Sequence, residues 1–494
     1  GTIFLIAAFL CNLFAMGDNV DRGQRTAGQL YSGSAIAAVF AGDMITLFVF
    51  FEIAAVASVF LIWAQGTERS YRAGMRYLII QIAAGVILLS GVLVHMSGTG
   101  SIAFNHLGLD TPGGYLILLA FGIKCAFPLL HNWLQDAYPE ATISGTVILS
   151  GFTTKLAIYA LARSYAGTDM LVWIGALMTA FPIFYAVIEN DLRRVLAYSL
   201  NNQLGFMVVG IGIGTELALN GAISHAFAHI LYKALLFMSM GAVLFRTGTV
   251  NGSDLGGLYK TMPWTTGFCV VGAASISGFP LFSGFVTKSM ILTAAVGEGH
   301  WFVWLVLLFA SAGVFHHSGI KIPYFAFFSH DSGKRPKEAP WPMLAAMALT
   351  SVLCIGIGVY PEPLYALLPF PVDYVPYSTY HVINQLQLLM FSALAFTVLM
   401  VTHIYPPELH STNLDTDWFY RRAAKSACLG AGRLIDRTYS AMTDWLIARV
   451  RWVVSGGRQN FNPLSPLGGN SRVGSGVVWI SALLLVGLVA AYSG

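Results

Sequence analysis

Six charged side chains fall inside long apolar runs, where a charge is costly. An ionisable group at the centre of a membrane-spanning helix costs about 2.5–3.5 kcal/mol on insertion scales, so each needs a compensating reason. Such groups can take up and release protons, and they predict a row of proton-exchanging side chains inside the molecule. They are one carboxylate and five lysines: Glu52, Lys124, Lys155, Lys233, Lys288 and Lys321.

One segment combines histidine with lysine at helical spacing. The sequence HAFAHILYK places His225, His229 and Lys233 at positions i, i+4 and i+8. On an α-helix these lie within about 80° of one face and span about 12 Å. Imidazole titrates near neutral pH, and a desolvated lysine releases its proton more readily than one in water. We predict a proton-carrying ladder; the alternative is a pair of satisfied core histidines. Without nearby Cys or carboxylate partners, no metal site is expected.

Two apolar runs are interrupted by Gly or Pro beside a lysine. Lys124 is followed by Pro128, and Lys288 is preceded by the run 278–280 (GFP). Corresponding interrupted segments in two halves of a chain are typical of transporters built from an internal repeat. The pattern therefore predicts two related repeats, each with a broken helix that carries a lysine.

The spacing of the next lysines agrees with this duplication. Lys155 follows Lys124 at about the same distance as Lys321 follows Lys288. We also predict that Glu52 pairs with Lys124, and that breaking this pair drives the lysine proton off. A purely structural ion pair is the alternative, because buried pairs need not be functional. Lys321 lies nearer the end of its run, where a lysine can reach the membrane surface.

Several other polar residues give weaker signals. His131 follows a break in an apolar run and is predicted at the membrane interface, as a possible additional member of the path. Arg193 and Arg194 are most simply residues at a helix end whose side chains extend to the interface. His316 and His317 adjoin a helix and indicate no particular chemistry.

The elements that must position these residues follow from composition. Of 494 residues 56% are hydrophobic and only 10% charged, against about 25% charged in soluble domains. Runs near twenty apolar residues must be helices in lipid, because β-barrel strands are shorter and alternate. We predict an all-α integral membrane protein with about fourteen spans. The expected segments are 2–16, 26–42, 43–64, 73–96, 115–134, 143–163, 170–188, 195–214, 218–246, 265–295, 301–328, 341–360, 385–405 and 476–493.

The chain divides by composition into six parts. The segment after residue 405 interleaves Arg and Lys with Trp, which is typical of an amphipathic helix at the membrane surface; a solvated connector is the alternative. Because the sequence starts at Gly1 inside an apolar run, we expect a preceding portion to be missing. The parts are an N-terminal helix region (1–25), two repeats (26–188 and 189–330), further spans (331–405), the amphipathic segment (406–475) and a last span (476–494).

Other chemistries find no support in the sequence. It contains no GxxxxGK[ST], GxGxxG or HExxH motif, so we predict neither a redox nor a hydrolytic site in this chain, and no cofactor. The five cysteines are scattered and are expected to be small core residues. The net charge of +4 is spread over loops, which argues against nucleic-acid binding.

Six motifs resemble a known family. The chain is similar to the antiporter-like proton-channel subunits of respiratory complex I and to the related large subunits of Mrp-type sodium/proton antiporters. The match covers roughly residues 26–295, and the C-terminal region looks more like the D subunit of the Mrp type. The motifs are GDMITLFVFFEI, GIKCAFPLLHNWLQDAYPEA, TTKLAIYALAR, ENDLRRVLAYS, HAFAHILYKALLF and GFPLFSGFVTK.

The resemblance implies two inverted five-helix repeats, each with a broken helix, and a chain of buried charges at mid-membrane height. It implies that Glu52 is the carboxylate paired with Lys124, and that Lys155 is the bridging lysine. The histidine–lysine ladder would line the central hydrated path, and Lys288 would be the exit-side group. Lys321 lies outside the matched motifs, so its role rests on spacing alone.

From these patterns we expect a proton-translocating subunit of a multisubunit Na⁺ or K⁺/proton antiporter in the cell inner membrane. Its expected partners are other membrane subunits, the lipid bilayer, protons and Na⁺ or K⁺. One alternative is a proton-pumping subunit of complex I or of a membrane-bound hydrogenase, driven by redox chemistry in other chains. Another is a membrane scaffold subunit whose buried charges only fix helix register.

Overall fold

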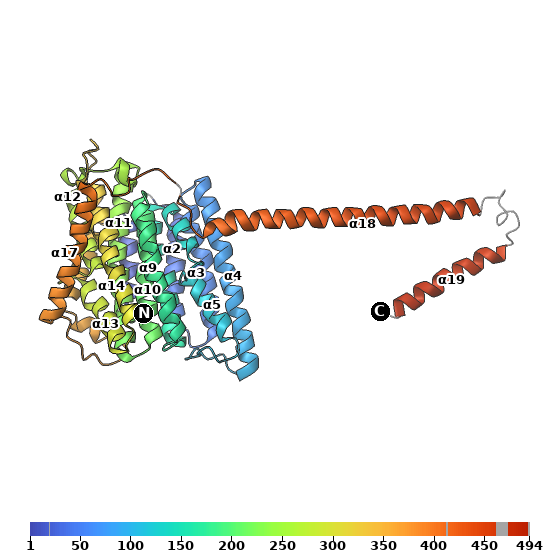
Figure 1. The fold of residues 1–494 in the computed structure, drawn as a ribbon, viewed down its shortest axis with the longest axis horizontal. Coiled ribbons are helices and arrows are strands. Elements are labelled where there is room, and N and C mark those ends of the chain that lie inside the picture. Colours follow the sequence, from blue (N-terminus) through green and yellow to red (C-terminus); the bar gives the residue numbers. More distant parts are fainter. Residues whose placement is uncertain (19, 412, 461–472, 493–494) are drawn as a thin grey trace. The chain divides into compact units, whose positions relative to one another are not determined.

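The computed structural model describes residues 1–18, 20–411, 413–460 and 473–492. It consists of two units, residues 1–415 and 416–494, which are described separately. Within the described ranges every regular element is helical, with only isolated β-bridges (Figure 1). The predicted all-α class is therefore confirmed. Parts of the predicted segments 1–25, 406–475 and 476–494 lie outside the described residues.

The first half of the bundle begins with four helices and ends with two that are interrupted. The long helix α4 carries a capping box at Thr67, and α2 and α3 are capped by aspartates. These caps satisfy backbone N–H groups that would otherwise lack partners. The elements are α1 (Thr2–Ala15), α2 (Arg22–Val39), α3 (Met44–Trp63), α4 (Glu68–Thr99), α5 (Gly114–Lys124), α6 (Asn132–Ala137), η1 (Tyr138–Glu140), α7 (Ile143–Gly151) and α8 (Thr153–Ser164).

The second half has the same kinds of element. Its longest helix, α11, carries the predicted histidine–lysine ladder, and the segment after α14 is a π-helix. The elements are α9 (Asp169–Ile188), α10 (Leu192–Ile213), α11 (Glu216–Thr247), η2 (Gly252–Asp254), η3 (Leu258–Lys260), α12 (Pro263–Ser277), α13 (Ser283–Gly297), α14 (Trp301–Val314), η4 (Phe315–Lys321), η5 (Tyr324–Phe328), α15 (Trp341–Val359), α16 (Glu362–Tyr365) and α17 (Thr379–Val401).

Eight helices in the described part of the chain are long and apolar enough to cross a membrane. This establishes a multi-pass membrane protein, but it is fewer than the fourteen spans predicted. The difference lies partly in broken segments: the run 115–134 folds as α5 and α6, and 265–295 folds as α12 and α13. The predicted first span is the short helix α1.

Both predicted helix breaks are present, and their backbone explains them. After α5, Ala126 and Leu129 adopt left-handed conformations with φ of 62° and 69°. After α12, Gly278 and Leu281 do the same, with φ of 72° and 75°. A non-glycine residue is rarely left-handed, so surrounding packing must hold these turns. Lys124 ends the first half of its broken helix.

The two halves share further features. Asp43 caps α3 and forms a β-bridge with Ala103, just after α4. Asp191 caps α10 and forms a β-bridge with Asn251, just after α11. Helices α4 and α11 both have 32 residues. An internal duplication would produce these matches. The duplication and its predicted boundary at residue 189 both stay predictions.

The second unit contains η6 (Phe419–Ala424), the 36-residue α18 (Lys425–Asn460) and α19 (Val473–Tyr492). Thus much of the predicted amphipathic segment is helical. Its first residues instead belong to the first unit, where residues 402–411 and 413–415 form a connection that we call the strap. Four cysteines are buried as predicted, but Cys428 on α18 is exposed.

Candidate functional site

The predicted pair of Glu52 and Lys124 is present. Lys124 Nζ lies 3.4 Å from Glu52 Oε1 and 3.4 Å from the side-chain oxygen of Gln81. The lysine also lies over the ring of Phe51, 5.0 Å from its centre. Lys124 is 1% exposed, whereas the Glu52 side chain is 21% exposed. The carboxylate is therefore the member of the pair that is open to the surroundings.

The break in the helix positions Lys124. Because α5 ends there, its last carbonyls are satisfied by the turn that follows: Phe127 N–H donates to Gly122 at 2.9 Å and Ala126 N–H to Ile123 at 3.1 Å. Trp133 on α6 donates its indole N–H to the carbonyl of Ile123 at 2.9 Å, which ties the two halves of the broken helix together. A cavity of about 10 Å³, lined by Lys124, Gln81 and Thr153 among others, adjoins the lysine. This is roughly room for one water molecule.

Lys155 lies beyond that cavity, next to another helix break. The lysine is 2% exposed and donates to the carbonyl of Ser150 at 2.5 Å and to the hydroxyl of Thr154 at 3.2 Å. The interruption at Phe152 between α7 and α8 explains the free Ser150 carbonyl. Thr153, two residues before Lys155 on α8, lines the cavity beside Lys124, and its hydroxyl lies 2.6 Å from that of Tyr31.

The histidine–lysine ladder on α11 is fully buried, with each of its three side chains 0% exposed. His225 contacts Thr287 through Nδ1 at 3.0 Å and Gln203 through Nε2 at 3.2 Å. The rings of His225 and His229 are 6.4 Å apart. Neither ring nitrogen of His229 has a hydrogen-bond partner among the described residues. These histidines are therefore not both satisfied core residues.

Lys233 and Lys288 are the remaining two predicted lysines of the site, and both donate hydrogen bonds to buried oxygen atoms. Lys233 donates to the hydroxyl of Ser199 at 2.9 Å and to the carbonyl of Leu196 at 3.2 Å. Lys288 is 3% exposed and donates to the carbonyl of Ile276 near the end of α12 at 2.8 Å. Its neighbour Thr287 is the partner of His225, which places Lys288 next to the ladder.

In the described part of the chain, three of the predicted lysines are buried without a countercharge. No ion pair joins Lys155, Lys233 or Lys288 to a carboxylate within the ranges that the structure describes. Burying an ammonium without a carboxylate is expensive unless the group can also exist neutral. These three lysines are thus suited to taking up and releasing protons.

His131, predicted at the membrane interface, is buried within the protein. Its side chain is 1% exposed, with Nε2 3.1 Å from Asp415 on the strap. Asp415 also accepts a hydrogen bond from Tyr198 at 3.0 Å. The ring of Phe181 lies 4.5 Å from the imidazole ring. The strap covers His131. Its partner Asp415 could not be predicted from the sequence because the two residues are 284 positions apart.

Lys321 does not extend to the surface either. Its side chain is 0% exposed and pairs with Glu408 of the strap at 2.9 Å. It also donates to the carbonyls of Val187 and Glu189, both at 2.7 Å, at the end of α9. A cation at a helix C-terminus satisfies carbonyls that the helix leaves unpaired and complements the helix dipole.

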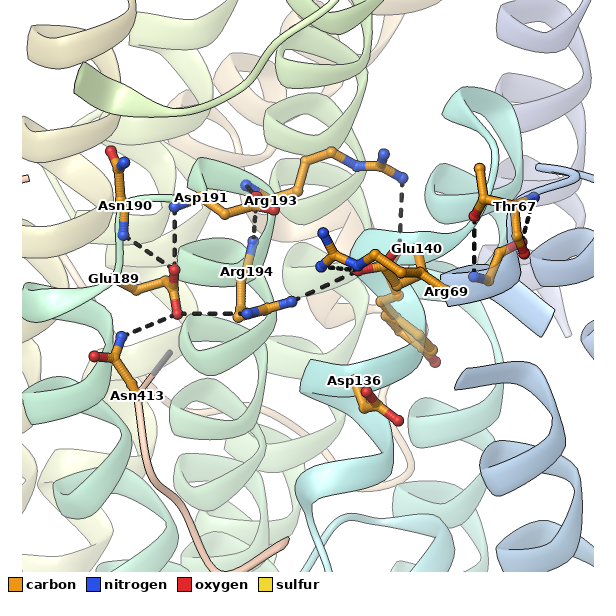
Figure 2. A network of polar contacts seen from close by, with 12 residues as sticks. Thr67, Arg69, Asp136, Glu140, Glu189, Asn190, Asp191, Arg193, Arg194 and Asn413 are labelled. Carbon is orange, nitrogen blue, oxygen red and sulfur yellow. Dashed lines mark hydrogen bonds and ion pairs between the residues drawn. The ribbon is translucent and has the colours of Figure 1, made fainter. Parts of the chain in front are cut away.

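A charged network lies where the turns between helices meet (Figure 2). Arg69 and Arg194 both approach Glu140, at 2.6 and 3.7 Å, and Arg194 also approaches Glu189 at 3.9 Å. Asn413 of the strap donates to Glu189 at 3.2 Å. Sequence reasoning missed this network, because each of its residues alone is an ordinary charged residue in a loop or helix end.

Arg193 lies at the start of α10, as predicted, but its side chain is buried. It is 3% exposed and donates to the carbonyl of Ala141 at 2.9 Å and to the hydroxyl of Thr146. Its guanidinium therefore fastens α10 to the turn before α7. The only sequence signal was the position of Arg193 at the start of an apolar run, which does not indicate burial.

Replacing Gly85 on α4 by alanine is expected to weaken transport without weakening the fold. A Cβ at this position would overlap the carboxylate of Glu52, the flexible end of a side chain that can move away. Folding should then cost little, but the Glu52–Lys124 pair must open. We expect the rate of proton transport to fall about tenfold. This is less than the loss of about a hundredfold or more that follows removal of a proton-transfer group, because Glu52 and Lys124 are both still present.

The control is Gly33→Ala, since a Cβ at Gly33 on α2 would meet nothing within 4 Å. Alanine favours helix by about 1 kcal/mol over glycine, so this variant should be as stable as the wild type and as active. Thermal midpoints of the purified complex and transport rates in vesicles measure both effects. Equal activity of the Gly85 variant and the wild type would contradict the role of the pair.

The fold and the site define a class: multi-pass helical membrane proteins with two broken helices and a buried row of lysine and histidine. The family model described as NADH:quinone oxidoreductase/Mrp antiporter, TM matches residues 41–313, more than half of the chain. The chain belongs to this family. The predicted resemblance is thereby confirmed.

Individual proteins of this family are similar to the chain in sequence and in fold. Over 356 residues, 66% of this chain and 71% of the relative, it is 32% identical to the D subunit of a Na(+)/H(+) antiporter of Alkalihalophilus pseudofirmus. It is 34% identical over 347 residues to the N subunit of an NADH-quinone oxidoreductase of Desulforudis audaxviator, covering 64% of this chain and 69% of the relative. A chain of the Mrp complex from Dietzia has a similar fold, with a TM-score of 0.67 at 22% identity, covering 82% and 84% of the two chains.

Proposed function

We propose that this chain is the proton-translocating subunit of a multisubunit Na⁺ or K⁺/proton antiporter in the cell inner membrane. One observation carries the proposal: Lys124 pairs with Glu52, while Lys155, Lys233 and Lys288 are buried with no carboxylate partner among the described residues. The similarity to the D subunit of a Na(+)/H(+) antiporter supports the antiporter class. Partner subunits are expected, because the structural relative is part of a multisubunit complex.

The proton is expected to enter at Glu52, whose side chain is the more exposed member of its pair. Protonation of this carboxylate removes the attraction that holds the charge on Lys124, so the lysine releases its proton. Water in the adjoining cavity, which Thr153 also lines, can carry that proton towards Lys155. The ladder and Lys288 then take it further. Thr287, the residue directly before Lys288, hydrogen-bonds to His225 at 3.0 Å.

The repeated architecture supports an exchange mechanism. Two inverted repeats with broken helices would place equivalent lysines on either side of the central ladder. In this proposal the boundary lies between α8 and α9, earlier than residue 189, so the first repeat spans α2–α8 and the second α9–η5. Lys155 and Lys321 lie in the last helical segment of each repeat, on α8 and η4.

The test is collapse of a pH gradient on addition of Na⁺ or K⁺ to vesicles that carry the whole complex. Wild type should respond without an electron donor, and Lys124→Ala should lose at least about a hundredfold in rate, the lower part of the range for a lost proton-transfer group. Lys124→Ala as active as wild type would refute the path.

A second candidate is a proton-pumping subunit of a complex I-type or hydrogenase assembly. The specific observation in its favour is the similarity to the N subunit of an NADH-quinone oxidoreductase, at an identity close to that of the antiporter relative. The pH-gradient assay in the same vesicles distinguishes the two candidate functions. If wild type moves protons only when a redox substrate is supplied, the second candidate holds and the first does not.

A further inference from the structure

A row of polar side chains leaves the central ladder in a direction that the path to Lys288 does not use. Lys233 donates to the hydroxyl of Ser199 at 2.9 Å. Ser199 accepts a hydrogen bond from Ser318 at 2.7 Å, and Ser318 lies 2.8 Å from Nδ1 of His317. All four side chains are fully buried, at 0% exposure. The row links α11, α10 and η4, which are far apart in the sequence.

The far end of this row is an unused imidazole nitrogen. Nε2 of His317 has no hydrogen-bond partner among the described residues, although it is buried. Buried polar atoms are nearly always paired, so an unpaired one in a fully buried ring requires an explanation. An imidazole that receives a proton at one nitrogen and releases it at the other is such an explanation.

The π-helix places His317 on the way to a carboxylate. His317 and Lys321 are four residues apart in η4, so they lie on similar sides of it. Single π-helical turns inside longer helices occur frequently at functional sites. Lys321 holds Glu408 of the strap at 2.9 Å, and the Glu408 side chain is 6% exposed against 0% for Lys321. The residues on either side of Glu408 are exposed, so this part of the strap lies at the surface of the chain.

We propose that Ser199, Ser318, His317 and Glu408 form a second proton branch, from Lys233 to the surface at the strap. This rests on the proposed function of the chain. Lys233 gives a proton to Ser199 as the two serine hydroxyls turn, so that Ser318 donates to Nδ1 of His317. His317 releases a proton from Nε2, and water carries it to the carboxylate of Glu408. Glu408 then releases this proton outside the bundle and Lys233 is reprotonated from the ladder. The cycle closes when the serine hydroxyls turn back and the proton on His317 returns to Nε2.

Lys321 has a positioning role in this branch. Its ammonium already contacts two carbonyls of α9 at 2.7 Å and Glu408 at 2.9 Å, so it is saturated with acceptors. A cation held this firmly is a poor proton carrier, but it fixes the carboxylate of the strap next to the bundle. Lys155 and Lys321 occupy similar positions by sequence spacing, but in this proposal Lys155 carries protons and Lys321 positions a carboxylate.

The test uses the whole complex in vesicles, with the pH-gradient assay applied to Ser318→Ala, His317→Gln and Glu408→Gln. We expect each to lower cation-driven proton transport about tenfold. This is less than the hundredfold loss of a central group, because the Lys288 end stays open. Ser318→Ala removes one hydroxyl from a packed site, so it carries the test if the histidine variant fails to assemble.

His316→Gln is the matched control. This neighbouring histidine is half-buried and stacks on Tyr405, with ring centres 5.6 Å apart, and it takes no part in the row. It should keep transport within about twofold of wild type, since it carries no proton. If the three branch variants match wild type while Lys124→Ala is inactive, the branch is wrong and the proposed function stands. If His316→Gln falls as far as His317→Gln, the effect is local packing and the branch is also wrong. If wild type itself shows no cation-driven transport, the proposed function fails.

Discussion

Replacing Lys233 by methionine should abolish proton transport while leaving the protein as stable as wild type or more stable. Lys233 is 0% exposed and contacts a hydroxyl and a backbone carbonyl, and the described part of the chain offers it no carboxylate within ion-pair distance. Replacing a buried charge by an apolar group of similar size is often neutral or stabilising. Transport should nevertheless fall at least about a hundredfold, because the ladder and the branch meet at this nitrogen.

The opposite signs of the two effects make this prediction discriminating. Transport is measured in vesicles and stability from the thermal midpoint of the purified complex. A scaffold whose buried charges only fix helix register would lose stability and function together, so a destabilised Lys233→Met variant would favour that alternative.

A surface lysine provides the control for the loss of a positive charge. Lys260 in η3 is 44% exposed and pairs with Asp331 at 2.7 Å. Hydrogen bonds from Arg335, and then from Lys260, hold the pKa of Asp331 below its usual range. Because Arg335 remains, Lys260→Ala should keep Asp331 ionised near neutral pH. It should change neither transport nor the thermal midpoint measurably, as is usual for exposed ion pairs.

Replacing Trp133 by alanine should produce the largest loss of stability. Trp133 is 1% exposed, packs against the rings of Tyr77 and Tyr138 at 5.5 and 6.0 Å, and donates to the carbonyl of Ile123. Truncating a buried aromatic side chain to alanine costs about 3–5 kcal/mol. Transport should fall as well, because Ile123 immediately precedes Lys124 and the second half of the broken helix would lose its anchor.

Two further variants separate packing from hydrogen bonding. Trp133→Phe keeps most of the ring contact and loses the hydrogen bond, which contributes about 1 kcal/mol. Its thermal midpoint should therefore lie between those of wild type and Trp133→Ala. Trp173 on α9 is 52% exposed, and Trp173→Ala removes the same side chain from the bundle surface. Trp173→Ala should therefore lower the thermal midpoint far less than Trp133→Ala. A Trp133→Ala variant as stable as Trp173→Ala would contradict the anchoring role.

The sequence by itself determined the class of protein and the central groups of the site. A charge inside an apolar run is costly wherever the helix packs, so Glu52, Lys124 and Lys288 were identifiable without any tertiary information. The ladder was identifiable for a local reason, since residues at i, i+4 and i+8 share a face of any α-helix. The positions of both helix breaks followed from Gly and Pro in the same way.

Only the tertiary structure decided which polar groups face each other across elements. His131 and Asp415 are 284 residues apart, and no periodicity connects them. Glu408 lies in the segment predicted as an amphipathic helix at the membrane surface, yet its side chain is buried and pairs with a lysine. The unpaired nitrogen of His317 depends on the π-helical register of η4 and on Ser318 meeting Ser199. Helical periodicity reports which face a residue occupies, whereas its partner depends on which element packs against that face.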